Sequence, residues 1–254
     1  MRGIVSRAMI VGFVGSGSMA AAMARGWVGE FERTLFSDSG SGRALELARS
    51  LGGEAVSNEE IGRRADLVVL AVKPNRLAEV APELGEAKEI ASVLAITTLD
   101  QLRTALPAAE HILRLMPNVA VEVRKGVLCA AGSASDRSWG KLAVLGRMVE
   151  IAEEDFDAAT AVMGCSPAYF ALAAEAIAAA GVRDGLDPDL ARELVADTAL
   201  GAAELLRRHD PAEVMTAVAS PGGATEAGLQ ALDREGAREA FAAAVEASLE
   251  RMRG

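Results

Sequence analysis

The sequence has few of the residues that build metal sites, disulfide frameworks or base-stacking surfaces. Its 254 residues include two cysteines and two histidines, and aromatic residues make up 4%. Cysteine and histidine ligands must cluster to bind a metal, so we expect no metal site. The same scarcity favours a reducing, cytoplasmic compartment, and it leaves little from which to build stacking platforms for nucleic-acid bases.

Positive charge is also scarce. Lys and Arg number 26 against 36 Asp and Glu, giving a net charge of −10, so a nucleic-acid partner is excluded. The start of the chain, with Arg2 and Arg7 before an apolar run, does not resemble a secretion signal. The weakly charged stretch 158–182 contains Pro167 and Glu175, which favours a buried helix of a soluble protein over a membrane span.

Up to about residue 150, short apolar runs alternate with amphipathic ones, as in a parallel sheet covered by helices on both faces. The predicted strands are Met9–Val14, Thr34–Ser37, Leu67–Val72, Ser92–Ile96, His111–Leu115 and Gly126–Ala131, and the predicted helices are Met19–Val28, Arg43–Leu51 and Ser138–Val149. From Glu153 onward the pattern predicts four or five Ala-rich helices and no strand. We therefore expect an α/β domain over residues 1–152 and an all-α domain over 153–254.

A glycine-rich turn stands where the first predicted strand meets the first predicted helix. After Gly12, the pattern Gly15-x-Gly17-x-x-Ala20 fits the dinucleotide-binding fingerprint, in which glycine lets the backbone approach a pyrophosphate. The following helix would offer free N–H groups through Ser16, Ser18 and Met19. The strand, helix and βαβ pattern around the turn favour a dinucleotide site over a simple tight turn.

The end of the second predicted strand bears on which dinucleotide binds. Ser37 is followed by Asp38, about 20 residues after the fingerprint, where a carboxylate bonds the ribose 2′-hydroxyl of NAD and repels a 2′-phosphate. The nearby serines and Arg43 are instead suited to the phosphate of NADP. Both interpretations of Arg43, a phosphate ligand or an exposed residue of a helix's first turn, stay open.

Two more loops follow predicted strands at their carboxyl ends, where ligands bind in open α/β sheets. Residues 71–75 follow one strand and include Lys73 and Pro74, and residues 114–118 follow another and end at Met116-Pro117-Asn118. Proline ends each strand, so the backbone leaves the sheet there. Either loop taken alone is a structural turn as readily as a site.

Taken together, these motifs resemble the pyrroline-5-carboxylate reductase family. The resemblance spans nearly the whole chain in order and is carried by Gly12–Ala20, Ala71–Pro74, Met116–Asn118, Gly164 with Pro167–Tyr169, Glu175-Ala176, Gly201–Ala203 and, most specifically, Ser220–Thr225 with Ala227–Leu229. It implies an N-terminal Rossmann domain, a C-terminal all-α dimerisation domain, a homodimer or larger assembly of dimers, and reduction of L-1-pyrroline-5-carboxylate to L-proline with NADPH or NADH as hydride donor.

The resemblance also implies site residues. Cofactor contacts fall on Gly15, Ser16, Gly17, Ser18, Met19, Asn58, Ala71, Val72, Lys73 and Pro74, with Met116, Pro117 and Asn118 near the nicotinamide, and substrate contacts on Ser220, Gly223, Ala224 and Thr225. The residue pattern itself adds Gly12, Ser37, Asp38 and Arg43 to the candidate cofactor residues. Val119-Ala120 and Met163–Ser166 depart from the family's usual residues. A related reductase of another cyclic imine, or a non-catalytic dinucleotide-binding regulator, is therefore kept as the alternative.

Hydride reduction of an imine needs no nucleophile or metal from the protein, because the nicotinamide carries the difficult step. The turn Ser220–Thr225 is suited to a substrate carboxylate through its backbone N–H groups and the serine hydroxyl. The Thr225 hydroxyl is positioned by sequence to contact the imine nitrogen, and we take it as the catalytic residue. It would orient the ring or relay a proton, or it would merely cap the following helix.

Overall fold

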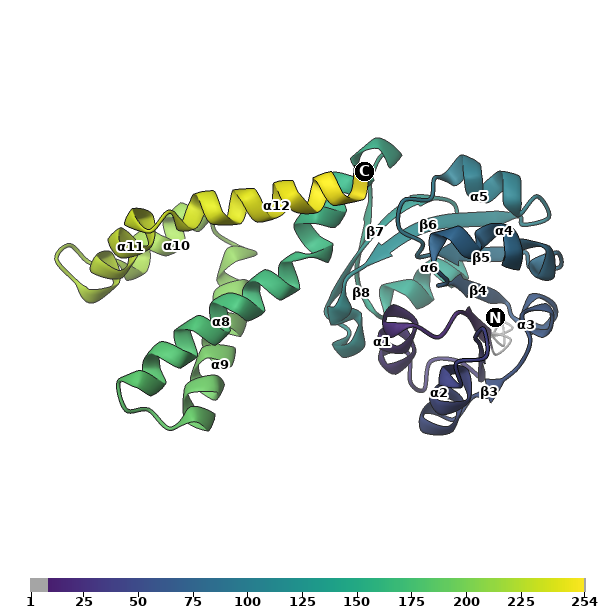
Figure 1. Cartoon of the computed structure of the whole chain (residues 1–254), viewed down its shortest axis with the longest axis horizontal. Coiled ribbons are helices and arrows are strands. Elements are labelled where there is room, and N and C mark those ends of the chain that lie inside the picture. The colour runs from purple at the N-terminus through teal and green to yellow at the C-terminus, as the bar shows by residue number, and fades with distance from the viewer. Residues whose placement is uncertain (1–8, 254) are drawn as a thin grey trace, which may run out of the picture. The chain divides into compact units, whose positions relative to one another are not determined.

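The computed structural model describes residues 9–253, so Arg2 and Arg7 lie outside the described residues. Contacts between Cα atoms divide the chain into two compact units, residues 1–164 with 249–254 and residues 165–248. Each unit is described separately below (Figure 1). The predicted boundary at residue 152 stays a prediction, because residues 153–164 pack with the first unit although no strand follows Glu150.

The first unit is built on a sheet whose described strands have the order β3-β2-β1-β4-β5-β6-β7-β8. Their bounds are β1 Ile10–Val14, β2 Arg33–Ser37, β3 Glu54–Ala55, β4 Leu67–Leu70, β5 Glu89–Ser92, β6 His111–Pro117, β7 Gly126–Gly132 and β8 Gly146–Glu150. All neighbouring pairs are parallel except β6 and β7, which are antiparallel. The order reverses between β1 and β4, as it does in Rossmann folds, so ligands are expected at that switch point.

Helices cover both faces of this sheet. The α-helices of the unit are α1 Ser18–Gly26, α2 Arg43–Leu51, α3 Asn58–Arg64, α4 Leu77–Val80, α5 Leu99–Ala105, α6 Asp136–Ala143 and α7 Phe156–Ala159, and its short helices of other types are η1 Pro74–Arg76, η2 Ala81–Leu84, η3 Val119–Val123, η4 Glu153–Asp155 and η5 Thr160–Gly164. One buried cluster contains Phe13, Met23 and Trp27, and the other contains Val14, Ile61 and Leu102. Two separate cores are what alternate faces of a covered sheet produce.

Two local predictions in this unit were wrong. The strand predicted at 92–96 is β5, which ends at Ser92, because the apolar run continues into a loop whose Leu94 is buried without pairing. The helix predicted over 138–149 ends at Ala143, and β8 follows. Gly146 has a φ of 150° and lies where a Cβ would stand 2.0 Å from the carbonyl oxygen of Gly126, so it begins a strand rather than continuing a helix.

The second unit consists of helices among the described residues, as predicted. They are α8 Ser166–Arg183, α9 Pro188–Leu206, α10 Pro211–Val218, α11 Ala224–Arg234 and α12 Ala237–Arg253, the last ending with residues assigned to the first unit. Aspartates set two of the starts: Asp187 accepts hydrogen bonds from the first turn of α9, and Asp210 forms a capping box with Glu213 before α10.

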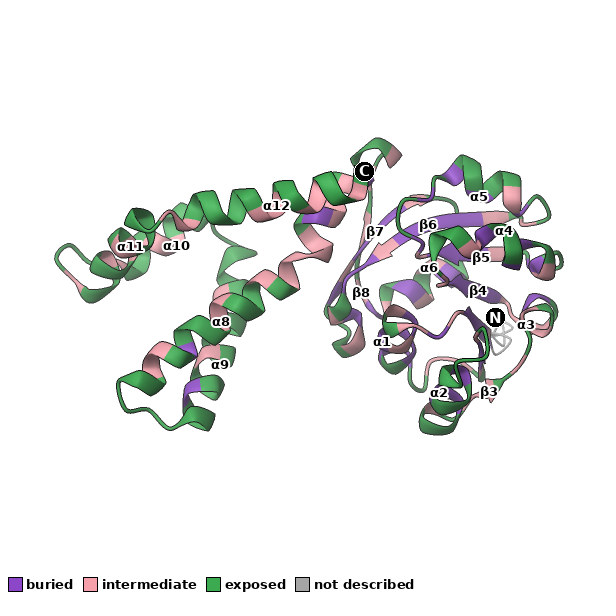
Figure 2. Ribbon diagram, in the orientation of Figure 1, coloured by how far each residue is buried: buried purple, intermediate pink, exposed green. Residues whose placement is uncertain are grey.

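The helices of the second unit leave most of their apolar side chains exposed, in contrast with the sheet (Figure 2). The prediction of a buried helix over 158–182 was wrong for the single chain, because only Ala178 of α8 is buried. The stretch Glu153–Arg183 is long and apolar enough to cross a membrane by length and composition, but one such helix is weak evidence of a span. The chain supplies little cover for α8 from its own residues.

Candidate active site

A cleft of about 610 Å³ lies at the switch point of the sheet, where the strand order reverses. It is lined by predicted cofactor residues, namely Gly15, Ser16, Gly17, Ser37, Asp38, Arg43, Asn58, Ala71, Val72 and Lys73. The segments that supply them are far apart in sequence and meet only because parallel strands present their carboxyl ends at one edge. Thus the structure brings together ten of the predicted positions.

The two glycines of the turn have different physical reasons to be glycine. Gly15 has a φ of 96°, and a Cβ there would stand 2.6 Å from the carbonyl oxygen of Ala71, so both backbone conformation and packing exclude a side chain. A Cβ on Gly17 would meet no atom of the chain within 4 Å. Gly17 is the N-cap of α1 and offers no side-chain cap, so open space faces the N–H groups of that helix. A pyrophosphate fits this cradle.

Charges in the cleft favour an anionic ligand. Its three carboxylates already have partners: Asp38 bonds its own loop, Glu79 pairs with Arg76, and Glu83 accepts a hydrogen bond of 2.6 Å from the side-chain amide of Asn58. Arg43 and Lys73 are exposed and form no ion pair within residues 9–253. Two unpaired cations suit the phosphates of a dinucleotide.

The carboxylate of Asp38 accepts hydrogen bonds from the loop that follows it. Its Oδ1 accepts from the Gly40 N–H at 2.7 Å, and its Oδ2 accepts from the Ala44 N–H at 2.8 Å and from the Ser41 hydroxyl at 3.0 Å. Burial alone would raise the pKa of this carboxyl, but these hydrogen bonds outweigh it and hold the pKa below its ordinary value. Both oxygens are therefore engaged in starting α2 and stabilising the loop rather than free for a ribose.

Asn58 and Ser37 are fixed in the cleft by hydrogen bonds to each other. The Ser37 hydroxyl donates to Oδ1 of Asn58, whose amide donates to Glu83. Ser16 donates to the carbonyl oxygen of Ser37 at 2.9 Å. The polar groups on this wall of the cleft are thus held in fixed orientations before any ligand binds.

Several predicted cofactor residues do not line the cleft. They are Gly12, Ser18, Met19, Pro74, Met116, Pro117 and Asn118. Gly12 is buried in β1, where a Cβ would stand 2.3 Å from Cγ2 of Ile61, so packing explains that glycine. Asn118 is 8% exposed, and its amide group bonds the backbone of Met163 and Val127 at 3.2 Å each. The side chain of Asn118 thus links the segment after β6 to Met163 and to Val127 in β7.

Sequence reasoning missed four residues of the cleft, Arg76, Glu79, Val80 and Glu83. They come shortly after Pro74, and counted from Arg76 they stand at positions i, i+3, i+4 and i+7, which lie on one face of a helix. That periodicity, directly after a predicted ligand loop, was the available signal. It was weak because the helix around them is short and broken into η1, α4 and η2.

The predicted substrate residues lie together in the second unit, in the turn before α11. Gly222 has a φ of 73° and donates its N–H to Glu226 at 2.7 Å, while the N–H of Gly223 bonds the Ser220 carbonyl at 2.9 Å. The N–H groups of Gly222 and Gly223 therefore have hydrogen-bond partners within the chain. Ala224 and Thr225 are the first two residues of α11. The N-cap is Gly223, so the alternative that Thr225 caps α11 was wrong. The Thr225 side chain is exposed.

Tyr169 has the packing role expected of it, and the packing role expected of Cys165 stays a prediction. The Tyr169 hydroxyl lies 3.1 Å from the Ala244 carbonyl oxygen and 2.7 Å from the Ser248 hydroxyl, and so it joins α8 to α12. Cys165 and Cys129 are both free thiols. Within residues 9–253, no cluster of three His, Cys, Asp or Glu side chains is arranged to hold a metal ion.

Comparison with known proteins agrees with both units. A family model described as "Pyrroline-5-carboxylate reductase dimerisation" matches residues 153–254, and one described as "NADP oxidoreductase coenzyme F420-dependent" matches residues 10–99. The chain is 33% identical to pyrroline-5-carboxylate reductase 3 of Rattus norvegicus, over 94% of this chain and 93% of the relative. It is 34% identical to the pyrroline-5-carboxylate reductase of Thermus thermophilus, over 96% and 97%.

Solved structures give the same result over the whole fold. A pyrroline carboxylate reductase of Plasmodium falciparum with NADP bound superposes with a TM-score of 0.82 at 27% identity, covering 96% of this chain and 97% of that one. The 1-pyrroline-5-carboxylate reductase of Streptococcus pyogenes gives a TM-score of 0.84 at 31% identity, covering 96% and 98%. Fold and site define an oxidoreductase that uses NADP. The chain belongs to the pyrroline-5-carboxylate reductase family.

Proposed function

We propose that this chain reduces L-1-pyrroline-5-carboxylate to L-proline with NADPH, the last reductive step of proline biosynthesis. The single observation that carries the proposal is the cleft at the switch point, in which two unpaired cations and a glycine cradle converge beside the start of α1. Family membership over nearly the whole chain supports the substrate. When bound, NADPH supplies the hydride that the imine carbon accepts.

In this proposal the chain's own residues bind and orient. The backbone from Gly15 to Met19 holds the pyrophosphate, and Ala71 to Pro74 lies along the dinucleotide. Arg43, with the hydroxyl of Ser39, takes the 2′-phosphate, because both oxygens of Asp38 accept hydrogen bonds from its own loop, one of them from the Ser41 hydroxyl. Met116 and Pro117 border the nicotinamide, and Asn118 supports them through its bonds to Met163 and Val127.

The turn Ser220–Thr225 is proposed to hold the substrate. The N–H groups of Ala224 and Thr225, at the start of α11, face the carboxylate, and the Ser220 hydroxyl and Gly223 backbone shape the turn around it. Thr225 orients the ring nitrogen through its hydroxyl and relays a proton from water, since an unperturbed threonine is a poor acid. This gives the imine nitrogen the proton that accompanies hydride addition to carbon.

The second unit is proposed to pair with a second copy of this chain in a homodimer, which larger assemblies would contain. Its exposed apolar side chains include Phe170 at 72%, Leu172 at 65% and Ile177 at 62%, all on α8. Large apolar side chains exposed in such number along one helix are typical of an interaction surface. A dimer would also give α8 the burial that the single chain does not. We place the enzyme in the cytoplasm, because a chain with two cysteines does not depend on disulfides and suits a reducing compartment.

The test is oxidation of NADPH and, separately, of NADH by the purified protein, followed by nicotinamide absorbance with pyrroline-5-carboxylate and with its six-membered homologue. Rapid oxidation with the five-membered imine is expected. Reaction with only the larger ring would move the substrate to another cyclic imine, which the unusual Val119-Ala120 segment would then explain. Binding of NADPH without turnover of either imine would contradict the enzyme assignment and favour a dinucleotide-binding regulator.

A further inference from the structure

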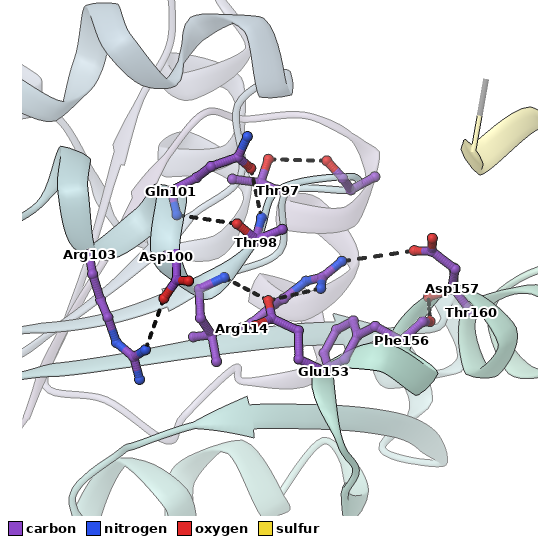
Figure 3. A network of polar contacts seen from close by, with 12 residues as sticks. Thr97, Thr98, Asp100, Gln101, Arg103, Arg114, Glu153, Phe156, Asp157 and Thr160 are labelled. Carbon is purple, nitrogen blue, oxygen red and sulfur yellow. Dashed lines mark hydrogen bonds and ion pairs between the residues drawn. The ribbon is translucent and has the colours of Figure 1, made fainter.

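Arg114 is a buried charge that the proposed chemistry leaves unexplained. It lies in β6, is 4% exposed, and is the one charged residue in the buried set of residues 9–253. Its guanidinium donates to Oε1 of Glu153 at 3.1 Å, lies 4.0 Å from Asp157 and stands 4.2 Å from the centre of the Phe156 ring (Figure 3). Glu153, Phe156 and Asp157 belong to one segment that follows β8.

Glu153 joins two parts of the first unit at once. Its Oε1 accepts a hydrogen bond of 2.6 Å from the N–H of Leu99, the first residue of α5, as well as the bond from Arg114. The start of α5 already has a complete capping box from Thr98 and Gln101. The helix therefore does not depend on Glu153 for its cap, and the carboxylate instead links the loop after β5 to β6 (Figure 3).

The other end of the same segment is hydrogen-bonded to Asn118, the residue directly after β6. The side-chain amide of Asn118 donates to the carbonyl oxygen of Met163 at 3.2 Å. Between the two attachments, Phe156 is 1% exposed beneath Arg114. Residues 153–163 are thus attached at one end to Arg114 in β6 and at the other end to Asn118, the residue directly after β6, and these two positions flank Met116 and Pro117.

Stability alone is a poor reason for this arrangement. Desolvating Arg114 fully and Glu153 in part opposes their mutual attraction, so an apolar pair of similar volume commonly serves stability as well. An ion pair is directional, however, and it fixes the register of two segments where apolar packing allows sliding. The segment that would be fixed is the one bordering the nicotinamide in the proposed function.

We propose that Arg114 and Glu153 are positioning residues for hydride transfer. Their ion pair sets the placement of Met116 and Pro117 against the nicotinamide, while the adenosine end of the cofactor is held separately in the cleft lined by Arg43 and Asn58. This inference rests on the proposed function. It assigns an effect on turnover, and a much smaller effect on cofactor affinity, to an ion pair outside the cleft in which Arg114 is buried and Glu153 is partly exposed.

The experiment compares Glu153→Ala and Glu153→Gln with Glu154→Gln, a neutralised carboxylate one residue away that is exposed. Since misplacing reacting groups by about 1 Å costs up to about 100-fold in rate, we expect Glu153→Ala to lower kcat about 30-fold. Glu153→Gln keeps an acceptor for Leu99 and Arg114, so it should recover most of that loss. Kd for NADPH should change less than about 2-fold in all three, and Glu154→Gln should match the wild type.

A purely structural role would lower Tm while leaving kcat per folded molecule and the emission of bound NADPH unchanged, and that result would overturn the inference. Wild-type protein that binds NADPH but reduces no imine would instead contradict the proposed function. In that event the emission of bound NADPH still reports the nicotinamide environment. A changed emission in Glu153→Ala but not in Glu154→Gln would support positioning, and an unchanged emission would overturn it.

Discussion

The two units of this chain complete themselves in different ways. The dinucleotide unit buries its sheet on both faces and assembles a cleft from residues 15 to 83 of a single chain. The helical unit has one buried residue in α8, Ala178, and one in α9, Ala191, and exposes long apolar side chains. The first unit therefore forms both its core and its cleft within one chain. The helical unit does not bury its apolar side chains within one chain.

The contrast between the two units would fail if the helical unit were stable without a partner chain, and the largest effect is expected from a change that tests this. We expect Leu172→Glu, on α8, to disrupt the dimer and lower kcat/KM by about 100-fold, because burying an unpaired charge at an interface costs about 3–5 kcal/mol. Light scattering coupled to gel filtration measures the mass of the assembly. Leu45→Glu is the control, since Leu45 is 47% exposed but lies in the dinucleotide unit. Equal effects of the two changes would contradict the proposed interface.

The next largest effect is expected at Thr225. Its side chain is exposed in the chain, so Thr225→Ala should leave Tm and Kd for NADPH unchanged. Losing a hydrogen bond to a charged or developing ammonium costs about 1.5–3 kcal/mol, which predicts a fall in kcat of about 10- to 100-fold. Steady-state kinetics with pyrroline-5-carboxylate checks this. Thr225→Ser should restore activity, and a fully active alanine variant would remove the catalytic role.

Substituting each of the two fingerprint glycines distinguishes an effect on stability from an effect on cofactor binding. Gly17→Ala has space in the protein alone but blocks the approach of a pyrophosphate, so Kd for NADPH should rise about 10-fold with little change in Tm. Gly15→Ala meets the backbone of Ala71 at a φ of 96°, so it should lower Tm as well. Calorimetry measures the Tm of both variants, and fluorescence titration measures their Kd for NADPH. Identical behaviour of the two variants would argue against a pyrophosphate at Gly17.

Asp38 gives a smaller effect whose sign decides between two roles. As a loop cap, Asp38→Asn loses hydrogen bonds to Ala44 and Ser41, so NADPH affinity should fall about 3-fold. As a residue that repels the 2′-phosphate, the same change would raise NADPH affinity relative to NADH. Kd values for both cofactors test this. Because the folded loop lowers the pKa of Asp38, its stabilisation is present at neutral pH and is lost as pH falls through that lowered value.

The smallest effect is expected at Ile96, in the loop after β5. It is a β-branched residue with a φ of 58° and is 60% exposed, so its backbone is strained and little apolar burial compensates. Ile96→Gly should relieve about 1 kcal/mol of strain, offset in part by the greater entropy of glycine in the unfolded chain. We expect Tm to rise by about 2 °C or less in a thermal melt. A lower Tm would show that Ile96 contributes packing.

Much of the site followed from sequence because its parts are local. The strand, glycine turn and helix from Ile10 to Gly26 are contiguous, so their pattern predicts both the fold and the pyrophosphate cradle. The loops after β4 and β6 were found from two prolines, Pro117 at the end of β6 and Pro74, which begins η1 four residues after β4 ends. Errors arose where a glycine or a neighbouring strand decided the outcome, as at Gly146, where close approach to Gly126 starts β8.

The roles of Asp38 and Asn118 depended on the tertiary structure. Sequence placed a carboxylate and an amide at ligand positions, but hydrogen bonds from Ala44 to Asp38 and between Asn118 and the Met163 carbonyl engage both side chains. Likewise, no sequence spacing predicts that Arg114 meets Glu153 across 39 residues. A side chain's type is fixed by the sequence, whereas its hydrogen-bond partners depend on which distant segments fold against it.

The sequence by itself determined the class of fold, the dinucleotide fingerprint, the order of the motifs and the helical character of the C-terminal part, since each rests on contacts between near neighbours. Only the tertiary structure decided which cleft residues converge, which carboxylates are already bonded, and that α8 lies exposed in a single chain. Those properties come from long-range packing of strand ends and helix faces, where the free energy of burial depends on residues that no local pattern brings together.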